Sequence, residues 1–279
     1  MKTVPESQTK RKSMIGETDF QTVITVDGDP TYAMVLIGDH ARRALPAAHG
    51  TLGLPAHEFE RHIAYDIGVE GVIRCLARRL NAPAAMAGFS RLLIDPNRGE
   101  DDPTLIRQLY DGTVVPGNYP MSAGELEERL ERYYRPYRAG VAELIADVER
   151  ASGRAPFIVS IHSFTPQMQG VKRPWQVGVL WDRDPRGPQP LLEALRADLS
   201  LVVGDNEPYD GALRGDMMFT YAIRPGFAHV LIEIRQDLIA DAGGQEEWAA
   251  RLAPILDAIN QRDDMHESVQ YGSRTGPVT

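Results

Sequence analysis

Short apolar runs alternate along the chain with longer stretches in which apolar residues recur every three or four positions. Short apolar runs are typical of strands buried on both faces, and the longer spacing is typical of helices that cover a core. The pattern predicts six strands, at residues 33–37, 92–94, 157–161, 177–181, 201–203 and 229–234. It predicts four helices, at residues 61–80, 123–151, 189–198 and 246–261. This alternation favours one sheet with helices on both faces.

Two local features refine the organisation of the 279 residues. Ser122 is followed three positions later by Glu125, a capping-box spacing that marks the start of the second helix. Residues 1–29 and 263–279 are polar and lack apolar periodicity, so they are predicted to be mobile tails. A single domain is therefore expected at residues 30–262.

Composition narrows the possible partners. Thirty Lys and Arg against 39 Asp and Glu give a net charge of −9, which argues against nucleic acid and anionic membranes. The sequence shows neither an apolar run long enough to span a membrane nor the apolar segment of a secretory signal, so the cytoplasm is the expected location. Cys75 is the only cysteine, so any metal must be held by His and carboxylate side chains.

Polar side chains end three of the predicted strands. In open α/β sheets, ligands bind beyond the carboxyl ends of the strands. His40 follows the first strand, His162 follows the third, and Glu233 ends the last. A single His at a strand end is more often a hydrogen-bonded structural residue than a ligand. Together, however, the three residues form a plausible metal site with a carboxylate acid/base.

A catalytic zinc usually takes three protein ligands, and the predicted helix at residues 61–80 offers the third. Its inward stripe carries His62 and Asp66 near the amino end. An ionisable side chain on a buried stripe needs a charged partner or a polar network, although either residue could also cap or pair locally. We expect Asp66 to be the third ligand, with Glu60 and His62 as alternatives.

Further candidates lie beside these strand ends. Arg98 follows the predicted second strand, and its guanidinium could hold a substrate carboxylate through two nitrogens; it could also be a surface residue after an Asp-Pro turn. Asn97 and Ser163 are candidate substrate contacts. The chain lacks the motifs that define dinucleotide sites, P-loops, α/β-hydrolases and zincins, so these readings have no support.

Seven ordered blocks of the chain resemble the N-formylglutamate amidohydrolases. They are Asp39–Ala41, Thr51–Pro55, Arg61–Gly68, Ser90–Arg98, His162–Pro166, Asn206–Tyr209 and Leu231–Ile239. The resemblance spans residues 33–239, nearly the whole expected domain. It implies a three-layer α/β/α domain with a mostly parallel or mixed sheet, similar to zinc carboxypeptidases and peptidoglycan amidases.

The resemblance also implies a reaction. Such an enzyme hydrolyses N-formyl-L-glutamate, or a similar N-acyl amino acid, with a divalent metal, expected to be Zn²⁺, and belongs to histidine degradation. The roles it implies are metal ligation by His40, Asp66 and His162, acid/base catalysis by Glu233, and substrate-carboxylate binding by Arg98 and Arg235.

One position departs from the family pattern. Many relatives read Pro-Tyr-His where this chain has Pro136, Tyr137 and Arg138. If that His assists catalysis, its loss would shift the substrate to another N-acyl compound or favour a non-catalytic binding protein that keeps the fold.

Overall fold

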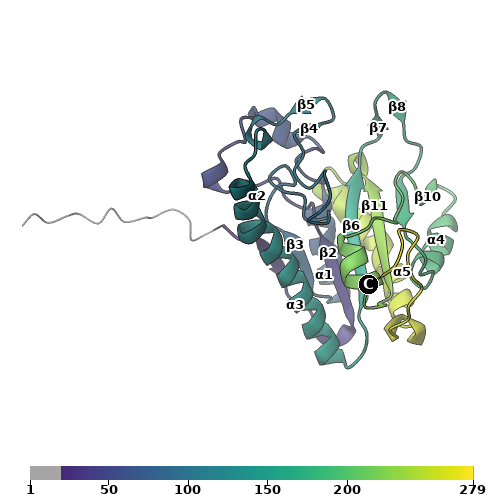
Figure 1. Ribbon diagram of the computed structural model, residues 1–279. Coiled ribbons are helices and arrows are strands. Elements are labelled where there is room, and N and C mark those ends of the chain that lie inside the picture. Colours follow the sequence, from purple (N-terminus) through teal and green to yellow (C-terminus); the bar gives the residue numbers. More distant parts are fainter. Residues whose placement is uncertain (1–19, 279) are drawn as a thin grey trace, which may run out of the picture.

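A seven-stranded mixed sheet forms the centre of the domain in the computed structural model, which describes residues 20–278 (Figure 1). The strands lie in the order β1-β3-β2-β6-β11-β9-β10. β1 runs antiparallel to β3 and β9 runs antiparallel to β11, while the remaining neighbours are parallel. The strands are β1 (Val23–Val26), β2 (Met34–Gly38), β3 (Ala84–Ala87), β6 (Phe157–Phe164), β9 (Val177–Leu180), β10 (Val203–Asp205) and β11 (His229–Arg235).

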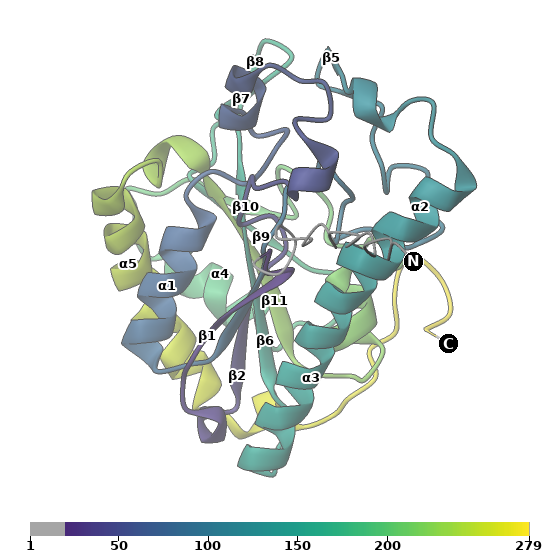
Figure 2. The same ribbon diagram turned by 90° about the vertical axis from the view of Figure 1, so that its left-hand side faces the viewer.

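Helices cover both faces of this sheet (Figure 2). α1, α4 and α5 pack on one face, and α3 packs on the other, preceded by α2. Alternate residues of one strand point to opposite layers, so Leu36 of β2 joins the core under α1 and α5 while Val35 joins the core under α3. The helices are α1 (Val69–Leu80), α2 (Ala123–Arg129), α3 (Arg135–Ser152), α4 (Pro188–Arg196) and α5 (Ala242–Asn260). The fold is the predicted α/β/α sandwich.

Two short hairpins rise above one end of the sheet, at the top of Figure 1. They are β4 (Leu109–Tyr110) with β5 (Thr113–Val114), and β7 (Gln167–Met168) with β8 (Val171–Lys172). The second hairpin directly follows β6, so this is the end of the sheet where β6 and its parallel neighbours finish. No helix within residues 20–278 is both long enough and apolar enough to cross a membrane.

The predicted strand at residues 92–94 is wrong. Leu92, Leu93 and Ile94 are fully buried, but they lie in a turn in which the Leu93 N–H donates to the Ser90 carbonyl. Burial under the α3 layer explains their apolar character, and β3 supplies the strand instead. β1 was not predicted and lies within the stretch expected to be an N-terminal tail; residues 1–19 are outside the described residues.

The predicted helix at residues 61–80 is wrong at its amino end, because α1 begins only at Val69. Gly68 caps the helix with φ of 85°, a left-handed conformation that turns the chain sharply. The preceding loop is tied to the sheet by the Asp66 N–H, which donates to the His40 carbonyl at 2.8 Å. Asp66 therefore faces the core from a loop and not from a helix stripe.

Residues 263–278, expected to be a C-terminal tail, lie against the domain. A 3-10 helix at Asp263–His266 buries Met265 completely. Further on, Arg274 forms ion pairs with Asp182 and Asp210. The segment is polar because its side chains, such as Arg274, form ion pairs with the rest of the domain.

Replacing Gly68 by Ala should destabilise the fold and disturb the loop that carries Asp66. An added Cβ would lie 2.1 Å from the Ile239 carbonyl oxygen, and the positive φ adds strain. We expect a loss of about 2–4 kcal/mol in the free energy of unfolding, measured with urea. Gly50→Ala is the control, since Gly50 has φ of 53° but nothing within 4 Å of an added Cβ. Equal losses in the two variants would contradict the steric explanation.

Candidate metal centre

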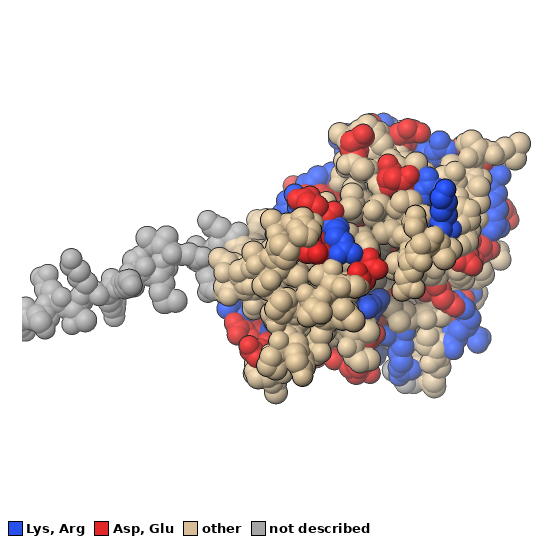
Figure 3. Space-filling model, turned by 90° about the horizontal axis from the view of Figure 1, so that it is seen from above, with Lys and Arg blue, Asp and Glu red and all other residues tan. Residues whose placement is uncertain are grey.

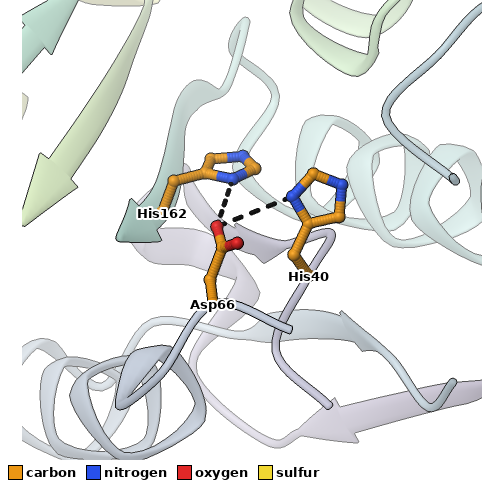
Figure 4. A group of neighbouring side chains, drawn as sticks. All are labelled: His40, Asp66 and His162. Carbon is orange, nitrogen blue, oxygen red and sulfur yellow. Dashed lines mark hydrogen bonds and ion pairs between the residues drawn. The ribbon is translucent and has the colours of Figure 1, made fainter. Parts of the chain in front are cut away.

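Three buried side chains meet at the carboxyl end of the sheet (Figure 4). His40 follows β2, Asp66 lies in the loop before α1, and His162 belongs to β6. The Asp66 Oδ2 atom lies 2.9 Å from His162 Nδ1 and 3.5 Å from His40 Nδ1. One ligand atom from each residue lies within 4.8 Å of the other two. Two imidazoles and one carboxylate at this spacing form a set that could hold a divalent metal.

The structure distinguishes the three candidates for the third position. Glu60 is largely exposed and pairs with Arg43. His62 lines the neighbouring cavity, where its Nε2 atom lies 3.5 Å from Asp111. Asp66 alone of the three lies between the two histidines.

Two further aspartates stand behind the imidazole rings. Asp95 Oδ1 lies 2.7 Å from His40 Nε2, and Asp39 Oδ2 lies 3.4 Å from His162 Nε2. Asp39 is itself held by the Tyr137 hydroxyl, which donates to its Oδ1 at 2.7 Å. Carboxylates in this position orient the rings of metal-binding histidines. Neither aspartate has a role predicted from the sequence, although Asp39 directly precedes His40 and Asp95 lies two residues before Asn97.

Arg91 balances the buried negative charge. Its guanidinium donates to Asp95 at 2.7 Å and lies 3.5 Å from Asp66. Burial would raise the pKa of both carboxyls; His40 and His162 hold the pKa of Asp66 well below its usual range, and Arg91 and His40 do the same for Asp95. Burial acts to lower the pKa of His162, but the neighbouring Asp39 and Asp66 carboxylates raise it to about 10. A metal would therefore have to displace a proton from this ring.

One further observation indicates that these side chains could hold a metal. The His40 Nδ1 atom is buried and has no hydrogen-bond partner among residues 20–278. Buried polar nitrogens are almost always satisfied, and an orphan that faces a second imidazole and a carboxylate is suited to ligation.

Glu233 stands next to this group. It is paired in register with His162 across the parallel strands β11 and β6, so both side chains emerge on the same face of the sheet. Its Oε2 atom is buried without a hydrogen-bond partner. Burial raises the pKa of Glu233 to about 8 despite the opposing effect of His162. A carboxyl with this pKa can exchange protons near neutral pH.

A cavity of about 490 Å³ opens over these residues. Its lining includes the metal-centre residues and Glu233, and the predicted substrate contacts Asn97, Arg98 and Ser163. Figure 3 looks onto this end of the molecule, where acidic and basic side chains are interspersed.

Arg107 is a cavity residue that the sequence analysis missed. Its guanidinium stacks on Tyr110 at 4.5 Å from the ring centre. Among the described residues no carboxylate lies within ion-pair distance of Arg107, and its Nε atom is buried without a partner. The Arg98 guanidinium donates to the Asn97 carbonyl at 2.9 Å, and the carboxylate that pairs with it, Asp102, lies 4.0 Å away. The cavity therefore carries positive charge that is available to an anionic ligand.

Two arginines singled out in the sequence lie elsewhere. Arg235 is outside the cavity lining and pairs with Asp237 at 2.8 Å. Arg138 is also outside the lining, between the rings of Tyr134 and Tyr221, and it donates to the carbonyl oxygens of Pro96 and Arg98. Arg138 thus supports the loop of Asn97 and Arg98 from behind.

Asp216 is a second buried carboxyl on the cavity wall. Its Oδ1 atom accepts a hydrogen bond from the Phe219 N–H at 2.6 Å. Burial raises the pKa of Asp216 to about 7, with a further contribution from Asp39, against the lowering effect of the Phe219 bond.

Comparisons with known proteins agree with this description. A family model described as N-formylglutamate amidohydrolase matches residues 32–240. The crystal structure of gene product Atu2144 from Agrobacterium tumefaciens is similar, with a TM-score of 0.78 and 31% identity over 86% of this chain and 94% of that one. The N-formylglutamate amidohydrolase from Ralstonia eutropha JMP134 shares the fold, with a TM-score of 0.61 and 21% identity over 86% of this chain and 95% of that one. Curated protein sequences give no match to this chain.

Replacing Asp66 by Asn should weaken metal binding sharply. The amide keeps the shape of the side chain but removes the charge between the two imidazoles. We expect a loss of about 10²-fold or more in Zn²⁺ affinity, measured by competition with a chromogenic chelator. Glu60→Gln is the control and should bind like the parent, because Glu60 is exposed and paired with Arg43. The reverse result would move the third ligand to Glu60.

Asp216→Asn should change how stability depends on pH. The folded-state pKa of about 7 lies above the ordinary aspartate value of 3.8, so the native state binds more protons than the unfolded state between these values. The parent should therefore lose stability as the pH rises from about 4 to about 7. Asn does not titrate, so the advantage of the variant should grow over this range by about 2–4 kcal/mol. Urea unfolding at pH 5, 6, 7 and 8 measures it, and a constant difference would contradict the assignment.

Proposed function

The chain belongs to the N-formylglutamate amidohydrolase family, and on this premise we propose that it hydrolyses N-formyl-L-glutamate, or a closely similar N-acyl amino acid, with a bound divalent metal. Family membership makes the chain a hydrolase that acts on an amide. The identity of the substrate and the metal is our proposal, with Zn²⁺ as the metal and His40, Asp66 and His162 as its ligands.

One observation carries this proposal: the candidate metal ligands, a candidate acid/base and two guanidinium groups all line a single cavity. The metal-centre residues lie at its base, Glu233 lies beside them, and Arg98 and Arg107 offer guanidinium groups without close carboxylate partners. The volume of about 490 Å³ is in the range of small-molecule sites.

Two carboxylates distinguish N-formylglutamate from most other formyl amino acids. A guanidinium can bind a carboxylate through two parallel hydrogen bonds, so Arg98 and Arg107 could each take one of them. Asn97 and Ser163 line the same cavity. This position supports the substrate contacts that we propose for them. Binding energy from these contacts would hold the formyl group in place for attack.

Proton transfer falls to Glu233. When bound, the metal supplies a Lewis acid and lowers the pKa of water. Glu233 accepts the proton of the attacking water and passes it to the leaving nitrogen, which departs as the free amine. Its position beside His162 and its unpartnered Oε2 support this role. Asp39, Asp95 and Arg91 keep the two imidazoles oriented.

Two wider assignments follow from the same proposal. Release of free glutamate and formate suits a place in histidine degradation, with the cytoplasm as the proposed location. The non-catalytic alternative rested on Arg138, and that residue lies behind the cavity wall, where it holds a loop in place.

Formate release is the direct test of this function. Protein reconstituted with Zn²⁺ should release one formate per molecule of N-formyl-L-glutamate, measured by a coupled formate assay, and chelation should abolish the release. N-formyl-L-alanine is the control substrate, because it lacks the side-chain carboxylate and should react with a higher KM. Absence of turnover with several N-acyl amino acids would overturn the proposal.

Glu233→Gln separates catalysis from binding. The amide cannot accept a proton from water, so kcat should fall by about 10²–10⁴-fold while Zn²⁺ content and KM change little. If Glu233 has only a structural role, the variant should instead lose thermal stability and keep its turnover per folded molecule. Steady-state kinetics and thermal unfolding of the same preparation distinguish these results.

A further inference from the structure

The C-terminal segment, residues 241–278, lies beyond the region that matches the family model, and its last part contacts the wall of the cavity. The family model ends at residue 240, whereas the chain described by the structure continues to residue 278. This segment contacts the loop at residues 206–213 through Arg274, and directly after that loop the Arg214 guanidinium donates to the Pro277 carbonyl at 3.4 Å. We call residues 206–213 the wall loop.

Arg274 makes the principal contact between the two. Its N–H and Nε atoms donate to Asp182, which is buried, at 2.9 and 3.0 Å. Its Nη1 atom donates to Asp210 Oδ2 at 2.9 Å, and Nη2 donates to Asp210 Oδ1 at 2.5 Å. Nη2 also donates to the Trp181 carbonyl. One guanidinium therefore bridges the buried end of β9 and the wall loop, through the paired geometry that fixes a carboxylate most firmly.

The wall loop lines the cavity directly. Tyr209, Asp210, Gly211 and Ala212 all belong to the lining. The loop is anchored at its base by Asn206, whose Oδ1 atom accepts from the N–H groups of Trp181 and Gly211. The Asp210 side chain is held from within the loop by the Ala212 N–H, which donates to its Oδ1 atom at 2.9 Å, and from outside the loop by Arg274.

The contact also affects the charge of the cavity. Hydrogen bonds from Arg274 lower the pKa of Asp210, as expected where a guanidinium pairs with an ionised carboxyl. Without Arg274, the Asp210 carboxylate would keep the Ala212 N–H but lose its charged partner, and its negative charge would lie on the wall of a cavity that offers Arg98 and Arg107 to an anionic ligand. An uncompensated negative charge on the wall opposes the binding of an anion in the same cavity.

We infer that Arg274 is a positioning residue of the cavity, which fixes the wall loop and offsets the charge of Asp210, so that the segment beyond the family region completes the binding site. The positioning part stands on the contacts alone. The charge part rests on the proposed function, because it requires an anionic substrate.

Hydrogen exchange followed by mass spectrometry tests the positioning part without any assay of activity. In Arg274→Met, the amides of the wall loop should exchange about tenfold faster than in the parent, while those of α1 should not change. Arg274→Lys, which keeps the charge but loses the paired geometry, should give a smaller increase. Arg262→Met is the matched control, since Arg262 pairs with Asp264 in the same segment and lies outside the cavity lining.

Kinetics test the charge part. With N-formyl-L-glutamate, Arg274→Met should raise KM by about three- to tenfold and leave kcat within about twofold. Adding Asp210→Asn to this variant should lower KM again, to near the parent value, because the uncompensated charge is then absent.

The outcomes separate the two ideas. Unchanged exchange in the wall loop, or equal acceleration at α1, would overturn the positioning role. Faster exchange in the loop with an unchanged KM would overturn the charge role. If the parent hydrolyses no N-acyl amino acid, the proposed function fails, and the exchange data still decide whether Arg274 positions the wall.

Discussion

The buried carboxylate of Asp66 joins the ends of three chain segments. Its Oδ2 atom accepts from the His162 ring and from the Ser163 N–H, and its own N–H donates to the His40 carbonyl. A carboxylate that is 4% exposed is stable only with charged partners, so the loop before α1 must bring it to both imidazoles. The contacts that close this part of the fold are therefore the contacts that build the candidate metal centre.

Charge balance explains how three buried aspartates can lie close together. Asp39, Asp66 and Asp95 are opposed by Arg91 and by the His162 ring, whose raised pKa keeps it protonated. A divalent cation would replace the proton as the compensating charge, so metal binding and proton release are coupled. Because Arg91 is permanently charged, it contributes in both states.

The sequence predicts elements that repeat a regular pattern better than it predicts loops. The capping box of Ser122 and Glu125 forms as expected, and β6 and β11 cover the predicted strands. His40 and His162 could be identified because they end apolar runs. Leu92 was misassigned since apolar content reports burial and not backbone conformation. Asp95 and Arg107 could not be given roles from the sequence, because only the fold brings Asp95 beside His40 and places Arg107 in the wall of the cavity.

Arg138 and Arg274 affect the shape of this cavity from outside it. Neither side chain lines it, yet Arg138 supports the loop of Arg98 and Arg274 supports the wall loop. Arg138 stands where the resemblance led us to expect a histidine, and Arg274 lies beyond residues 32–240, the region that matches the family model. A metal centre tolerates little displacement, because its ligand distances are fixed to a few tenths of an ångström. The walls have no such constraint, so residues behind them can change the substrate that fits without altering the chemistry proposed for Asp66 and Glu233.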